Sequence, residues 1–100
     1  MTYLINTALG NFNVDIHTNE VASFGTEYHS TIRKDDRIVA KVMDLRQVGK
    51  GFVPSPYHNK IIGLSEMQAI TLHMQAITFL KELAELDAYV LSLEETMELR

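Results

Sequence analysis

The last third of the chain, residues 66–99, reads EMQAITLHMQAITFLKELAELDAYVLSLEETMEL and contains neither glycine nor proline. Within it, apolar residues recur at alternating intervals of three and four from Ala69 to Met97. This spacing keeps the apolar side chains on one side of an α-helix, and it is the spacing with which helices pack along one another. The pattern therefore predicts one long helix, or two helices if the chain bends back near Asp87. The apolar stripe consists of Ala69, Leu72, Ala76, Phe79, Leu83, Leu86, Val90, Leu93 and Met97.

Ser65 marks the expected start of this helix. A serine before the first turn caps the helix with its hydroxyl, and Gln68, three residues later, can reach back to the serine N–H. A continuous helix to Leu99 would measure about 50 Å at 1.5 Å per residue. A compact chain of this length has a radius of gyration near 13 Å, hence a diameter of about 35 Å. The helix therefore either folds back as a second helix or projects from the domain and pairs with another copy of the chain.

The first 62 residues alternate between apolar and polar side chains, which is typical of half-buried strands. The polar clusters at 18–20 and 34–36 predict turns, and residues 49–56, which contain two prolines, should be irregular. The expected strands are 2–6, 12–17, 21–33, 37–45 and a short one near Lys60.

These elements predict a single α+β domain over residues 1–100. Its first part, residues 1–62, is an antiparallel meander of four or five strands, and its second part, residues 64–99, is helical. The long helix is expected to pack against the sheet.

Charge is distributed unevenly along a chain whose net charge is −4. Residues 66–100 hold seven acidic side chains against two basic ones, a balance of −5, whereas residues 1–65 hold six acidic and seven basic ones, a balance of +1. All seven of those bases lie between Arg33 and Lys60. The acidic helix and a pI of about 5.4 oppose binding to phosphate backbones, so the sequence disfavours nucleic acid as a partner.

The chain has no cysteine, which excludes disulfides, thiol nucleophiles and thiolate metal ligands. Its most apolar window, residues 67–80, is interrupted by polar side chains and is shorter than the roughly 20 apolar residues that cross a bilayer. The N-terminus does not resemble a signal peptide. We therefore expect no membrane association and a cytoplasmic location.

The apolar stripe changes in character along its length. Near its start, Ile70, Ile77 and Leu80 widen the apolar face, as expected where a helix covers a sheet. Towards its end the stripe narrows and is flanked by charged residues, which is typical of a helix that associates with another helix. We therefore expect a homodimer or a higher homo-oligomer. The predicted interface residues are Leu83, Leu86, Val90, Leu93 and Met97.

A second candidate site lies in the basic segment that follows the predicted strand 37–45. Gly49 and Gly51 would let backbone N–H groups approach a phosphate, and basic and aromatic side chains nearby would supply charge and a stacking surface. The spacing is not that of a P-loop. The candidate residues for a small anionic ligand such as a nucleotide are Arg46, Lys50, Phe52, Tyr57, His58 and Lys60.

Motifs for metal binding or catalysis are not recognised in the sequence. The four histidines, His17, His29, His58 and His73, do not have the spacing of metal ligands, so no metal site or other cofactor is predicted. No serine stands in a nucleophile-elbow context, so no catalytic residue is assigned. Acid–base chemistry could be assembled across strands only from residues such as Tyr28, His29 and Asp44. His73 is expected to border the helix core, with threonine and glutamine neighbours satisfying its ring.

The sequence therefore favours a non-enzymatic, small intracellular protein. It would self-associate through its C-terminal helix and bind a protein or other macromolecular partner as an inhibitor or adaptor. The alternative is an oligomeric protein that binds or sequesters a small anionic ligand through the Arg46–Lys60 region.

Overall fold

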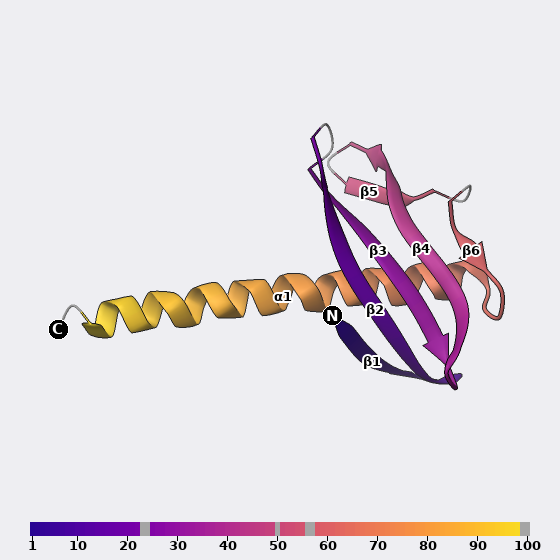
Figure 1. The fold of residues 1–100 in the computed structure, drawn as a ribbon, viewed down its shortest axis with the longest axis horizontal. Helices are drawn as coiled ribbons and strands as arrows, with labels where there is room; N and C mark the ends of the chain where they lie inside the picture. The colour runs from indigo at the N-terminus through magenta and orange to yellow at the C-terminus, as the bar shows by residue number, and fades with distance from the viewer. Residues whose placement is uncertain (23–24, 50, 56–57, 99–100) are drawn as a thin grey trace.

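The computed structural model describes residues 1–22, 25–49, 51–55 and 58–98, and for 45–48 and 87–98 it describes the backbone alone. The chain forms a sheet followed by one helix, α1 (Glu66–Glu98), which lies against one face of the sheet (Figure 1). The predicted α+β class is confirmed.

The sheet is an antiparallel meander in which each of the first five strands lies next to the one before it. Its order is β1-β2-β3-β4-β5, and a short strand, β6, pairs with β4 on the edge opposite β3. The strands are β1 (Thr2–Thr7), β2 (Gly10–Val21), β3 (Gly25–Lys34), β4 (Arg37–Val48), β5 (Gly51–Pro54) and β6 (Lys60–Ile61).

The turn that the sequence predicts at 34–36 is confirmed. Asp35 and Asp36 reverse the chain between β3 and β4 with φ angles of 51° and 64°, and aspartate tolerates this left-handed conformation better than most residues. The short strand near Lys60 is also confirmed as β6.

Two predictions about the sheet are wrong. Residues 18–20 form no turn, because they continue β2 and pair with β3, with Thr18 opposite Tyr28 and Glu20 opposite Thr26. Their polar side chains are exposed, so they signal the solvated end of a strand and not its termination. The segment 49–56 is likewise not wholly irregular, because Gly51–Pro54 forms β5 against the end of β4. Pro54 is accommodated because β5 is an edge strand.

The hydrophobic core lies between one face of the sheet and α1. Alternate residues of the strands point inward, as the period of two requires. They meet the first four turns of the helix, and the core is filled by Ile5, Phe12, Val14, Ile16, Ile32, Ala40, Val42, Ala69, Leu72, Ala76 and Ile77. On the opposite face of the sheet, side chains such as Asn13, His17 and Lys41 are exposed.

Helix α1 begins with the predicted capping box. The Gln68 N–H donates to Ser65 Oγ at 3.1 Å, and the Ser65 N–H donates to Gln68 Oε1 at 3.0 Å. Just before the cap, Gly63 passes close to β4, where a Cβ atom would lie 3.0 Å from Val39 Cγ1.

Helix α1 is continuous for 33 residues, so the second helix allowed by the sequence does not form. It crosses β4, β3 and β2, passes β1, and continues beyond the sheet (Figure 1). At 1.5 Å per residue its length is about 50 Å, and the longest dimension of the molecule is 55 Å. We call residues 83–98, which extend past the sheet edge formed by β1, the projecting half of α1. Across the described residues, no helix is long and apolar enough to pass through a membrane.

Candidate functional site

The apolar stripe of α1 passes from a buried to an exposed environment along the helix. Leu72 is 3% exposed beneath the sheet, whereas Leu86 is 57% exposed. The change occurs near Phe79, which is 40% exposed and whose ring lies against the Tyr3 ring of β1 at a centroid distance of 5.6 Å. The sheet therefore covers only the first half of the stripe, and the remainder continues into the projecting half.

The structure places the predicted interface residues on this projecting half. Leu83 is half-buried where the helix leaves the sheet, and together with Leu86 it lines a shallow apolar depression beside Tyr3 and Phe79. The three remaining residues, Val90, Leu93 and Met97, lie in the continuous helix, but their side chains lie outside the described part of the structure. Their role in an interface stays a prediction.

A larger apolar groove flanks the first half of α1. It has a volume of about 530 Å³ and lies between the β1–β2 turn and the start of the helix. Leu9 and Phe12 line it on the sheet side, and Gln68, Leu72 and Gln75 line it on the helix side. We call it the β1–β2 groove. Its rim is apolar as well, because Leu9 and Met67 are more than half exposed.

The predicted anion-binding residues are only partly described. Phe52 lines a pocket of about 350 Å³ between the sheet and α1, together with Asp44 and Lys81, so an acidic group is present beside it. His58 and Lys60 do not line this pocket. His58 Nδ1 lies 3.2 Å from Ser55 Oγ. Lys60 of β6 lies opposite Lys41 of β4.

The other three predicted anion-binding residues are incompletely placed. Arg46 lies opposite Val53 in the β4–β5 ladder, but its side chain is outside the described part of the structure, as are Lys50 and Tyr57 altogether. The anion site therefore stays a prediction.

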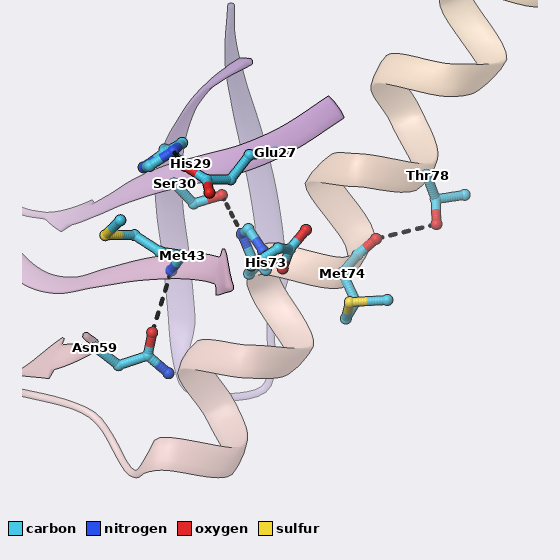
Figure 2. A network of polar contacts seen from close by, with 9 residues as sticks. Glu27, His29, Ser30, Met43, Asn59, His73, Met74 and Thr78 are labelled. Atoms are coloured by element: carbon cyan, nitrogen blue, oxygen red, sulfur yellow. Dashed lines mark hydrogen bonds and ion pairs between the residues drawn. The ribbon is translucent and has the colours of Figure 1, made fainter. Parts of the chain in front are cut away.

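A buried chain of hydrogen bonds joins α1 to the centre of the sheet. His73 of α1 is fully buried, and its Nδ1 lies 2.6 Å from Ser30 Oγ of β3 (Figure 2). Its Nε2 lies 2.6 Å from Asp44 Oδ1 of β4. A carboxylate only accepts hydrogen bonds, so Nε2–H donates to Asp44; in the neutral ring Nδ1 then accepts from the Ser30 hydroxyl. We call these three residues the Ser30–His73–Asp44 chain.

The same three residue types form the nucleophilic triad of many hydrolases, so their geometry decides what they can do. A catalytic serine must reach its substrate, whereas Ser30 is 2% exposed. The ring is also reversed, because in that template the serine bonds to Nε2 and the carboxylate to Nδ1. The arrangement therefore fits a structural role, in which hydrogen bonds hold α1 on β3 and β4. It does not fit a nucleophilic site.

Sequence reasoning missed this chain and assigned His73 the wrong partners. Its threonine neighbour Thr71 instead donates a hydrogen bond to the Met67 carbonyl oxygen within the helix, at 2.8 Å. The available signal was the position of Ser30 and Asp44, which occupy inward positions of strands next to Ile32 and Val42. Polar residues at such positions need a buried partner.

The acid–base set drawn from the sequence is not assembled. Tyr28 and Asp44 line the pocket beside α1. His29 lies elsewhere: its ring is stacked on that of His17, which is exposed, and its Nε2 contacts Glu27 Oε1 at 2.5 Å. Side chains alternate across the sheet, so His29 and Tyr28, as neighbours in β3, point to opposite faces. The described residues contain no group of three or more acidic, histidine or cysteine side chains placed to hold a metal ion.

Comparisons with known proteins give no relative from which a function could be inferred. No protein-family model matches the sequence, and the chain has no significant match among curated proteins or solved structures. The function must therefore be argued from the surfaces described above.

Proposed function

We propose that this protein is a non-enzymatic binding protein that self-associates through the projecting half of α1. The observation that carries the proposal is the exposure of the apolar stripe beyond the sheet, where Leu86 is 57% exposed on a helix that continues to Glu98. Full burial of one such leucine contributes about 1.5–3 kcal/mol. Association would therefore remove a substantial apolar surface from water.

The stability of the projecting half supports the same proposal. In proteins, most helical stability comes from packing an apolar face, and isolated helices shorter than about 12–15 residues are marginal in water. The projecting half is scarcely longer than this minimum length. It extends beyond the sheet against which the first half of α1 packs. A second helix packed along the stripe would supply the missing contacts. The face of the sheet opposite α1, which is polar and exposed, would stay accessible in the assembly and could bind a macromolecular partner.

The substitution Leu86→Glu tests the proposal. It places a charge on the exposed part of the apolar stripe, so the assembly should dissociate, and light scattering should give the 11.4 kDa mass of one chain. The unmodified protein should give at least twice that mass.

Ala84→Glu is the matched control. It adds the same charge to the same helix at an exposed position outside the apolar stripe. This variant should keep the mass of the unmodified assembly. A monomeric unmodified protein, or equal masses for the unmodified protein and Leu86→Glu, would refute the proposal.

A further inference from the structure

We propose that α1 pairs with α1 of a second copy in antiparallel orientation, and that the projecting half of each helix occupies the β1–β2 groove of the other copy. The inference rests on the proposed function, because it specifies the occupant and the orientation for the same surface. Three independent features of the described structure support it: the side of the helix on which the groove lies, the length of the projecting half, and the distribution of charge.

The groove and the exposed stripe lie on the same side of α1. Eighteen residues make five complete turns of a helix with 3.6 residues per turn. Leu86 and Leu93 therefore lie in the same direction from the helix axis as Gln68 and Gln75, both of which line the groove. Val90 is related in the same way to Leu72, which also lines the groove on the helix side. A second helix placed beside α1 on this side would contact the groove and the stripe together.

The two halves of the helix are matched in length. The midpoint of Glu66–Glu98 is Glu82, close to where the helix leaves the sheet. The projecting half spans about 24 Å, and four strands spaced about 4.8 Å apart, such as β1–β4, span about 14 Å between the outermost strand axes. A two-fold axis near Glu82 therefore lets each projecting half cross the sheet of the other copy.

In this arrangement the helix of one copy fills the groove of the other. Leu93 comes opposite Leu72 of the second copy, and Leu86 comes opposite Phe79 of the second copy. The β1 edges of both copies lie nearest the two-fold axis, and within the described sheet β1 is paired only with β2.

Charge favours the antiparallel orientation. The last turns of α1 contain Glu94, Glu95 and Glu98 and no basic residue, which is unfavourable at the negative end of the helix dipole. Antiparallel pairing brings these acids to the N-terminal end of the partner helix, where the dipole is positive and Glu66 is the acidic residue of the first turn. A basic residue, Lys34, contacts one of the residues that line the groove, because its Nζ donates to the Leu9 carbonyl oxygen at 2.8 Å. A parallel pair would instead place both acidic ends side by side.

Cross-linking of the full chain with a short bis-maleimide tests the orientation, since the chain has no cysteine of its own. In the double variant Gln75→Cys/Val90→Cys, the two positions in one chain are about 22 Å apart along the helix. Antiparallel pairing places each opposite the other across the interface, so this variant should form covalent dimers. Leu93→Cys is the control, because antiparallel pairing separates the two copies of position 93 by about 31 Å. It should not cross-link.

The outcomes separate this inference from the proposed function. Cross-linking of Leu93→Cys, or none of Gln75→Cys/Val90→Cys in a protein that light scattering shows to be dimeric, would overturn the antiparallel arrangement and leave self-association intact. An unmodified protein that is monomeric by light scattering would overturn both. Each cysteine variant should keep the dimeric mass in the absence of the cross-linker.

Discussion

At the scale of single residues, the Ser30–His73–Asp44 chain is the most constrained feature of the core. All three side chains are buried, and both ring nitrogens of His73 have a partner at 2.6 Å. A buried polar group that keeps its partners adds modestly to stability, whereas one that loses a partner is costly. The chain therefore adds directional contacts from α1 to β3 and β4 within the apolar core.

Ser30→Ala should lower the free energy of unfolding by about 1–3 kcal/mol, because it leaves Nδ1 of His73 without a hydrogen-bond partner in the core. Urea denaturation measures this change. Asn13→Ala, at an exposed position on the neighbouring strand, is the control and should change the free energy by less than about 0.5 kcal/mol. Equal stability of Ser30→Ala and the unmodified protein would show that the chain is not needed to hold the helix.

These residues also show where sequence reasoning stops. The inward positions of Ser30 and Asp44 follow from alternation, but their common partner is distant in sequence, 43 residues from Ser30 and 29 from Asp44. No local pattern pairs residues at such separations. The capping contacts of Ser65 and Gln68 could be predicted because both residues lie in one turn.

At the scale of elements, α1 carries one sequence pattern through two environments. The first half of the stripe is core, and the second half continues past the sheet. The spacing predicts the helix and its apolar side, because both follow from local geometry. The turn predicted at 18–20 is wrong because the end of a strand does not follow from local geometry alone. Whether a polar segment such as Thr18–Glu20 ends a strand depends on the neighbouring strand, and here β3 is long enough to continue the pairing.

Leucine-to-alanine substitutions in the two halves of α1 should have different effects. Leu72→Ala removes a side chain that is 3% exposed and should lower the free energy of unfolding by about 2–5 kcal/mol. Leu86→Ala should change the stability of the monomer by less than about 0.5 kcal/mol and should instead weaken the assembly. Urea denaturation at a concentration where the protein is monomeric, combined with sedimentation, distinguishes the two. Similar losses of monomer stability would mean that residue 86 is buried within its own chain.

At the scale of the whole molecule, the central feature is a helix of about 50 Å on a body whose other dimensions are 34 and 18 Å. The mismatch between helix length and domain size could be predicted from the sequence. The choice between folding back and projecting could not, although the lack of glycine and proline around Asp87 favours continuation. The β1–β2 groove could not be predicted either, because it is formed by a turn and a helix that are some sixty residues apart.

The central claim is that the projecting half of α1 becomes packed when two copies associate, and amide hydrogen exchange at several protein concentrations measures this most directly. Amides in the first half of the helix, beneath the sheet, should be protected at every concentration. Amides of residues 83–98 should exchange fast in dilute solution and become protected as concentration rises, in step with the increase in mass. Exchange of residues 83–98 that is independent of concentration would contradict the account.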